Sequence, residues 1–302
     1  MSRIHEALKR AEQERTAGQA RQGEPLPLPV SSSGSELSSP SMAMPTLSSS
    51  YASENLLARC PQMDWKPDKK TMLFFNAEEQ VCGSEEFRTL RSRLYQIREK
   101  QNVKKVLVTS ALPKEGKSFV AANLAQVMVR QHGRRALLID ADLRGARLHL
   151  ALGTSSAPGL SDYLMGEVDE FGGIQRGPME NLFFLPCGRE VSNPAELVAN
   201  GKLRTLLNQI EPLFDWIIVD SPPAVPVSDA SLLANYCDGV LMVVRSNETP
   251  ADIARKARQE FPEKALLGVV LNGIEAESSP YSQYYYGAYG RPQTKERGEM
   301  QS

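Results

Sequence analysis

A glycine–lysine–serine triplet is the first group of residues whose types and spacing suggest chemistry. Gly116, Lys117 and Ser118 follow a short apolar run from Val106 and open a helical pattern. Backbone N–H groups of such a loop and of the following helix N-terminus bind a phosphate anion, while the lysine adds charge and the serine hydroxyl reaches Mg²⁺. The general motif begins with glycine, but the chain has Ala111, the smallest replacement. The predicted phosphate-binding residues are Pro113, Lys114, Glu115, Gly116, Lys117, Ser118 and Phe119.

Two carboxylate motifs follow the loop, each at the end of an apolar run. Leu137–Arg144 reads LLIDADLR, and Ile217–Pro223 reads IIVDSPP. Ligands of open α/β sheets bind at the carboxyl ends of strands, and Mg²⁺ prefers a few carboxylates together with waters and phosphates. Asp142 and Asp220 are therefore predicted metal ligands, together with Ser118, and Asp140 is predicted to accept a substrate proton. An isolated aspartate of this kind would more often end a strand or cap a helix, but two such motifs after a phosphate loop favour a metal site.

The C-terminal region carries a cluster of tyrosines. Five of the nine tyrosines lie between residues 281 and 289, among glycine and serine, and they are Tyr281, Tyr284, Tyr285, Tyr286 and Tyr289. Such a segment is either an aromatic tail that packs on a partner or a set of phosphorylation acceptors. Each phosphate would add about −1.5 to −2 charges. Beside an ATP site, the acceptor interpretation is favoured.

A doubly wound, mostly parallel α/β sheet of the P-loop NTPase type is predicted to position these residues. Consecutive Val, Ile and Leu indicate strands covered on both faces. The expected strands are Val103–Thr109, Ala136–Asp140, Leu182–Pro186, Trp216–Asp220, Val240–Val244 and Leu267–Leu271. The expected helices are Ser118–Gln131, Leu203–Ile210, Asp229–Asn235 and Ala251–Gln259. Asn272, after the last strand, is either a contact to the adenine base or an ordinary turn residue.

The domain organisation follows from composition. The pattern of residues 1–20 predicts a short amphipathic helix, which either frays in solvent or docks on a partner. A disordered linker is predicted over 21–70, because residues 25–50 include ten serines and five prolines. The nucleotide-binding domain is expected over 71–275 and a flexible tail over 276–302. The net charge of −1 argues against nucleic-acid binding. No signal peptide or membrane-spanning run is recognised, so we expect a cytoplasmic chain with reduced cysteines.

Together these motifs resemble the bacterial tyrosine kinases of polysaccharide export. The resemblance rests on Pro113–Ser118 (PKEGKS), on Asp140–Arg144 as the family's DxDxR motif, on Asp220–Pro223, and on the tyrosine cluster, in family order. The most similar subgroup is the CpsD/CapB-type autokinases, including those linked to exopolysaccharide and exosortase loci, and the opening MSRIHEALKRAEQ also resembles it. The long N-terminal arm and the charged continuation to Ser302 depart from the family pattern.

The resemblance implies an ATP- and Mg²⁺-dependent tyrosine autokinase that tunes polysaccharide synthesis and export. It adds Arg144 to Lys117, Asp140 and Asp142 as catalytic residues. It assigns Glu85, Arg88 and Arg91, in SEEFRTLRSRL, to assembly of a ring of subunits, although a surface helix with ion pairs three residues apart would give the same pattern. It also implies a separate membrane partner of the chain-length-determinant (Wzz-like) type, location at the inner face of the plasma membrane, and a cognate tyrosine phosphatase.

Two other classes remain open. A MinD/ParA-type ATPase switch shares the sheet and nucleotide site, but it carries a signature lysine where this chain has Leu112. A non-catalytic ATP-binding regulator of a membrane export complex is the third class, and the aspartates retained at the strand ends argue against it.

Overall fold

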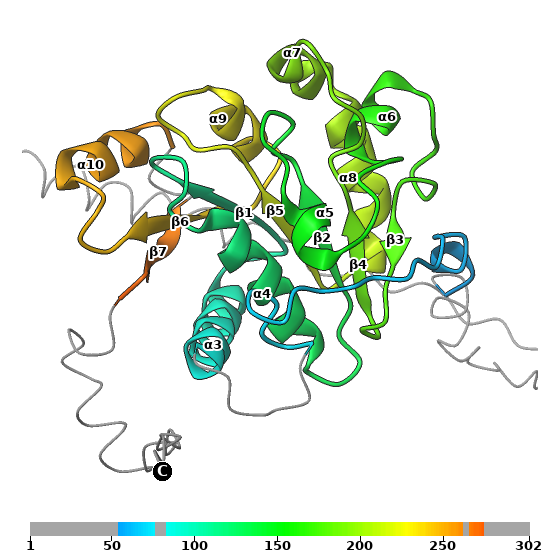
Figure 1. Cartoon of the computed structure of the whole chain (residues 1–302), viewed down its shortest axis with the longest axis horizontal. Coiled ribbons are helices and arrows are strands. Elements are labelled where there is room, and N and C mark those ends of the chain that lie inside the picture. The colour runs from blue at the N-terminus through cyan, green and yellow to red at the C-terminus, as the bar shows by residue number, and fades with distance from the viewer. Residues whose placement is uncertain (1–53, 76–82, 262–265, 275–302) are drawn as a thin grey trace, which may run out of the picture. The chain divides into compact units, whose positions relative to one another are not determined.

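The structure, a computed structural model, describes residues 54–75, 83–261 and 266–274 (Figure 1). The predicted helix over 1–20, the first part of the predicted linker and the tyrosine-rich tail lie outside the described residues, so these predictions stay open.

A seven-stranded sheet forms the centre of the described region, in the order β3-β4-β2-β5-β1-β6-β7. Every neighbouring pair is parallel except β3 and β4, which run antiparallel. The strands are β1 (Lys105–Ser110), β2 (Ala136–Asp140), β3 (Gln175–Arg176), β4 (Leu182–Leu185), β5 (Trp216–Asp220), β6 (Gly239–Arg245) and β7 (Leu266–Asn272). The predicted parallel α/β fold is confirmed, with strand ends shifted by two residues or fewer.

Helices cover both faces of this sheet (Figure 1). They are α3 (Ser84–Lys100), α4 (Lys117–Val129), α5 (Leu148–Leu152), α6 (Leu160–Met165), α7 (Pro194–Ala199), α8 (Lys202–Ile210), α9 (Asp229–Ala234) and α10 (Ala251–Gln259), with a 3₁₀ turn over Glu211–Leu213. The four predicted helices are α4, α8, α9 and α10. The short elements α5, α6, α7 and β3 were not predicted, because segments of two to six residues carry too little periodicity.

The strands bury alternate side chains in two separate cores. In β1, Val106 and Val108 pack with the apolar side chains of α3 and α4 on one face. Leu107 points to the other face and packs with α8 and α9. A strand buried on both faces must be apolar at consecutive positions, which is the pattern seen in the sequence.

The segment 54–75 corrects the predicted linker, which was expected to reach residue 70. A helical turn over 54–57 is followed by a strap over 58–75, and the segment buries large side chains, among them Leu57, Trp65 and Met72. The Trp65 ring packs edge-on against Phe184, with ring centroids 6.0 Å apart. The strap has no regular period, and its backbone N–H groups bond to distant loops, as Lys66 N does to Gly153 O at 3.1 Å. Its order therefore depends on tertiary contacts that no local pattern reveals, and the domain begins before the expected residue 71.

Within the described residues, every helix is too short or too polar to cross a membrane.

Candidate active site

The phosphate loop joins β1 to the start of α4, as the sequence predicts. The backbone of Gly116 has φ 95° just before the helix begins at Lys117. That conformation favours glycine, and a Cβ atom built there would lie 2.0 Å from Asn272 Nδ2. Asn272 Nδ2 in turn donates to Glu115 O at 2.9 Å. Glycine is thus required both by the turn and by the close approach of β7.

The Glu115 side chain is buried and held by hydrogen bonds within the protein. It is 3% exposed, and its carboxylate accepts from the Leu112 N–H at 2.6 Å and from the Thr249 hydroxyl. These two hydrogen bonds fix the Glu115 carboxylate and tie the start of the loop to the turn before α10. Sequence reasoning placed Glu115 in the phosphate loop but did not identify Thr249 as its anchor.

Lys117 lies among the predicted carboxylates. Its Nζ atom is 2.8 Å from Asp142 Oδ2 and 3.3 Å from Ser118 Oγ. Burial alone would lower the pKa of Lys117, but the nearby charges of Asp220, Asp142 and Asp140 outweigh it and raise the pKa. The structure therefore brings together the lysine and all three aspartates that the motifs single out.

Strand register explains why the carboxylates meet. Asp140 ends β2, Asp220 ends β5, and the two residues are register partners on neighbouring parallel strands. Asp140, Asp142 and Asp220 are 0%, 5% and 1% exposed. Burial, then the charges of Asp220 and Asp142, raise the pKa of Asp140 well above its usual value. Burial raises the pKa of Asp220 to about 6, opposed by Lys117 and by a hydrogen bond from the Ser118 side chain.

These groups fit a magnesium ion. Asp220 Oδ1 is buried and has no hydrogen-bond partner among the described residues. Lys117 forms an ion pair with Asp142, and three buried carboxylates near one ammonium leave excess negative charge. Hard oxygen ligands of this kind are those Mg²⁺ prefers, so Ser118, Asp142 and Asp220 would hold the ion, which would offset the charge of the transferred phosphate.

The pKa of Asp220 makes stability depend on pH in the nucleotide-free protein. Because the folded-state pKa is raised from 3.8 to about 6, the contribution of Asp220 to stability is full below pH 4 and is lost as the pH rises through about 6. We compare the free energy of unfolding of Asp220→Asn with that of the wild type by urea denaturation. We expect the difference in favour of the variant to increase by about 1 to 2 kcal/mol from pH 5 to pH 7.5. The exposed Asp64→Asn variant serves as control, and an equal gain at both pH values would contradict the prediction.

Arg144, a predicted catalytic residue, is paired elsewhere in this structure. Its guanidinium donates to Asp229 through Nε at 2.7 Å and through a second nitrogen at 3.1 Å. The Asp229 side chain is only 3% exposed, whereas that of Arg144 is 42% exposed. The bidentate pair links the loop after β2 to the start of α9, a contact between separate motifs that the sequence did not reveal.

This pairing predicts a structural effect for Arg144. We expect Arg144→Ala to lower the free energy of unfolding by about 1 to 3 kcal/mol, because a buried carboxylate loses both donors. The matched control is Arg147→Ala, three residues further on at an exposed position. Urea denaturation gives the free energy of unfolding of both variants and of the double variant Arg144→Ala/Asp229→Asn. The double variant shows how much of the loss comes from leaving the Asp229 carboxylate unpaired. A normal stability of Arg144→Ala would show that the pair is energetically irrelevant.

The remaining predicted residues divide into two groups. Asn272 contacts the phosphate loop, so its amide nitrogen is already engaged, and its contact to adenine stays a prediction. Glu85, Arg88 and Arg91 lie on α3. Glu85 pairs with Arg88 within the helix, whereas Arg91 donates to Val127 O at 3.0 Å and ties α3 to α4.

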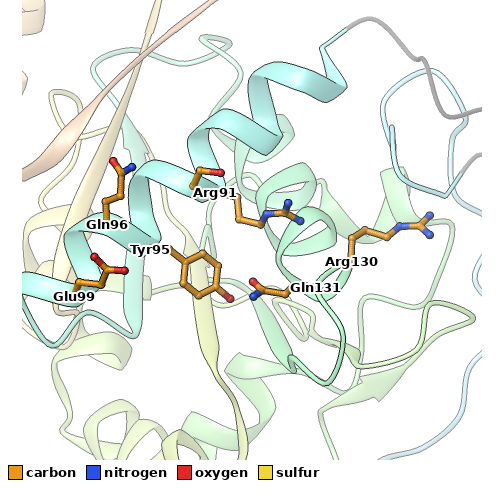
Figure 2. Close-up of a pocket in the computed structure, with 7 residues that line it drawn as sticks. Arg91, Tyr95, Gln96, Glu99, Arg130 and Gln131 are labelled. Carbon is orange, nitrogen blue, oxygen red and sulfur yellow. The ribbon is translucent and has the colours of Figure 1, made fainter.

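A surface depression lies beside Arg91, between α3 and the end of α4 (Figure 2). Its lining is Arg91, Ser92, Tyr95, Gln96, Glu99, Arg130 and Gln131. It is polar and open to solvent, and none of the phosphate-loop residues or strand-end aspartates lines it.

Fold and site together define a P-loop nucleotide-binding protein, and comparison with known proteins gives the family. No family model matches the chain. "Tyrosine-protein kinase YwqD" of Bacillus subtilis is 36% identical over 213 residues, covering 70% of this chain and 89% of that protein. "Putative tyrosine-protein kinase CapB" of Staphylococcus aureus is 31% identical and covers 71% and 95%. The kinase domain of Escherichia coli tyrosine kinase ETK superposes with a TM-score of 0.59 at 31% identity, covering 63% of this chain and 75% of that one.

The chain belongs to the family of bacterial tyrosine-protein kinases. Its enzyme class is that of a protein-tyrosine kinase on a P-loop ATP-binding fold, as the motif combination predicts.

Proposed function

We propose that this protein is an ATP- and Mg²⁺-dependent autokinase that phosphorylates Tyr281, Tyr284, Tyr285, Tyr286 and Tyr289. The observation that carries the proposal is the convergence of Lys117 with Asp140, Asp142 and Asp220 at the carboxyl ends of β2 and β5. Phosphoryl transfer needs positioned charge around the phosphate more than covalent chemistry, and this cluster supplies both signs of charge.

Each group then has a distinct role. The loop backbone and Lys117 bind the outer phosphates, while Ser118, Asp142 and Asp220 hold Mg²⁺. The phenol oxygen of an acceptor tyrosine forms a bond to the γ-phosphorus, the bond from that phosphorus to the ADP oxygen breaks, and Asp140 takes the phenol proton. The raised pKa of Asp140 favours this role, because a more basic carboxylate is a better proton acceptor.

The wider role rests on the resemblance of the motifs. We propose that copies of the chain assemble through α3, where Glu85 and Arg88 are surface groups, and that a neighbouring copy supplies the acceptor tyrosines. A membrane protein of the chain-length-determinant type would activate the kinase at the inner face of the plasma membrane. A phosphatase would reverse the modification, and the cycle would regulate exopolysaccharide synthesis and export.

The test is phosphotyrosine mapping. The purified full-length chain is incubated with ATP and Mg²⁺, with and without the cytoplasmic segment of the membrane partner, and analysed by mass spectrometry. We expect phosphate on residues 281–289 and none there when all five tyrosines are phenylalanine. ATP hydrolysis without phosphotyrosine in either sample would instead favour the ATPase switch.

A further inference from the structure

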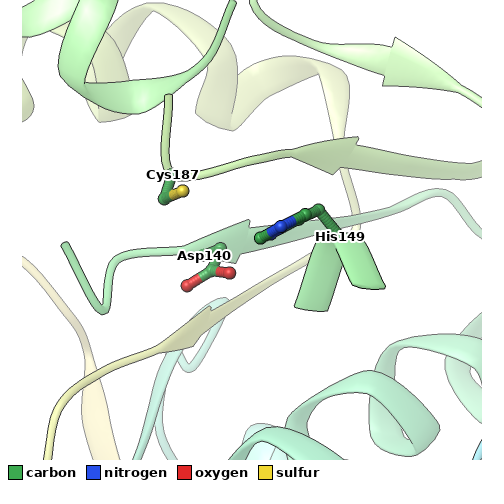
Figure 3. A group of neighbouring side chains, drawn as sticks. All are labelled: Asp140, His149 and Cys187. Carbon is green, nitrogen blue, oxygen red and sulfur yellow. The ribbon is translucent and has the colours of Figure 1, made fainter. Parts of the chain in front are cut away.

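Asp140, His149 and Cys187 form a cluster that the proposed reaction does not explain. The carboxylate, imidazole and thiol each place one ligand atom so that all three lie within 4.8 Å of one another. Figure 3 shows the three side chains converging from separate segments. Asp140 and Cys187 are 0% and 8% exposed, whereas the His149 ring is partly exposed, so the cluster reaches the surface on the side of His149.

The fold fixes this convergence. β2 and β4 are neighbouring parallel strands, with Ile139 paired to Leu185. Asp140 and Cys187 follow these paired residues by one and two positions, at the same edge of the sheet. His149 reaches the edge from α5, whose start is held by a bond from Leu148 N to Asp140 Oδ2 at 3.3 Å.

None of the three groups is saturated by protein partners. His149 Nδ1 is buried and has no hydrogen-bond partner among the described residues. Asp140 accepts two backbone N–H groups, from Asp142 and Leu148, both at a long 3.3 Å. The Cys187 thiol donates to its neighbour Gly188 O at 3.3 Å. A buried imidazole nitrogen without a partner is costly, and a bound group would relieve that cost.

Carboxylate, imidazole and thiolate are together the ligand set of a tetrahedral Zn²⁺ ion. With metal–ligand distances of about 2.0 to 2.3 Å, neighbouring ligand atoms are about 3.5 Å apart, so the cluster closes on an ion by movements of about 1 Å. Thiolate and imidazole distinguish this set from the oxygen ligands that suit Mg²⁺. One carboxylate and one thiolate also balance a divalent charge, which suits a buried position.

We propose that Asp140, His149 and Cys187 bind Zn²⁺, or a divalent ion of similar preference, at a site separate from the magnesium ligands. Solvent or an acceptor group would take the fourth position. The functional consequence rests on the proposed role of Asp140: a carboxylate bound to Zn²⁺ cannot accept the phenol proton. Zn²⁺ therefore inhibits tyrosine phosphorylation without displacing ATP.

Cobalt binding tests the site independently of catalysis. The metal-free full-length chain is titrated with Co²⁺, whose bond to a thiolate gives a charge-transfer band in the near ultraviolet, and Zn²⁺ is then added. We expect one equivalent to produce the band, and Zn²⁺ to remove it. Cys187→Ser should lose the band, and His149→Gln should weaken binding by at least about 10- to 100-fold. The matched control Cys60→Ser, another buried cysteine, should keep it.

The outcomes separate the site from the proposed activity. A band that is absent, or that persists in Cys187→Ser, overturns the inference. Thermal unfolding shows whether each variant is folded. Zn²⁺ should raise the Tm of the wild type and of Cys60→Ser, but not that of Cys187→Ser. In kinase assays with Mg²⁺ and ATP, Zn²⁺ should suppress phosphotyrosine in the wild type and spare Cys187→Ser. If the chain shows the cobalt band but forms no phosphotyrosine even without Zn²⁺, the proposed autokinase activity is refuted. The proposed Zn²⁺ site is still supported in that case.

Discussion

We expect the rate of tyrosine phosphorylation to be at least about 10²- to 10³-fold lower in the Lys117→Met variant. This is the range found when one preorganised donor that stabilises charge in a transition state is removed. Methionine keeps most of the unbranched side chain but removes the ammonium, which lies 2.8 Å from Asp142 Oδ2. It also leaves Asp140, Asp142 and Asp220 without the cation that offsets them in the nucleotide-free protein. Both effects disfavour a bound triphosphate.

The measurement is phosphotyrosine formation by the purified full-length chain, with ATP affinity determined in parallel. Lys202→Met is the matched control, because it makes the same chemical change at an exposed lysine at the start of α8, outside the site. Circular dichroism of both variants checks folding. Undiminished phosphorylation in Lys117→Met would refute the assignment of Lys117 and the site built around it.

The Asp140→Asn variant should separate binding from transfer. We expect nucleotide affinity to change little and phosphoryl transfer to slow by about 10²- to 10⁴-fold, the usual contribution of a positioned general base. Asparagine has nearly the same shape, so its oxygen can still accept a backbone N–H from Asp142 or Leu148. What it lacks is the capacity to take the phenol proton.

The same variant should be more stable than the wild type when no nucleotide is bound. Burial and the charges of Asp220 and Asp142 raise the pKa of Asp140, so its contribution to stability is present at low pH and is lost as the pH rises through the folded-state pKa. A neutral amide avoids that loss, and we expect a higher Tm at pH 7.5 for Asp140→Asn but not for the exposed Asp64→Asn. Loss of ATP binding in Asp140→Asn would instead place Asp140 among the ligands of the nucleotide's Mg²⁺.

The two variants probe different parts of one site. Lys117 neutralises charge on the phosphates, so its loss affects binding and transfer together. Asp140 acts on the acceptor, so its loss affects transfer alone. Single-turnover kinetics at saturating ATP would distinguish the two patterns, because they isolate the chemical step.

Local sequence determined the sheet and the positions of the main site residues. Strands β1, β2, β5 and β6 are apolar at consecutive positions because both faces are covered, so each strand and the residue at its end could be located. Parallel strands place their carboxyl ends at one edge, which predicts that Asp140 and Asp220 lie close together. The structure confirms that proximity through their register pairing.

Tertiary structure decided the partners of those residues and the start of the domain. The pairing of Arg144 with Asp229, the anchoring of Glu115 by Thr249 and the approach of Asn272 to Gly116 each join positions far apart in the chain. The segment 54–75 and the cluster of Asp140, His149 and Cys187 depend on the same kind of contact. Periodicity and motif spacing report only interactions between near neighbours, whereas these contacts exist only once the strands have paired and the loops at their ends have been brought together.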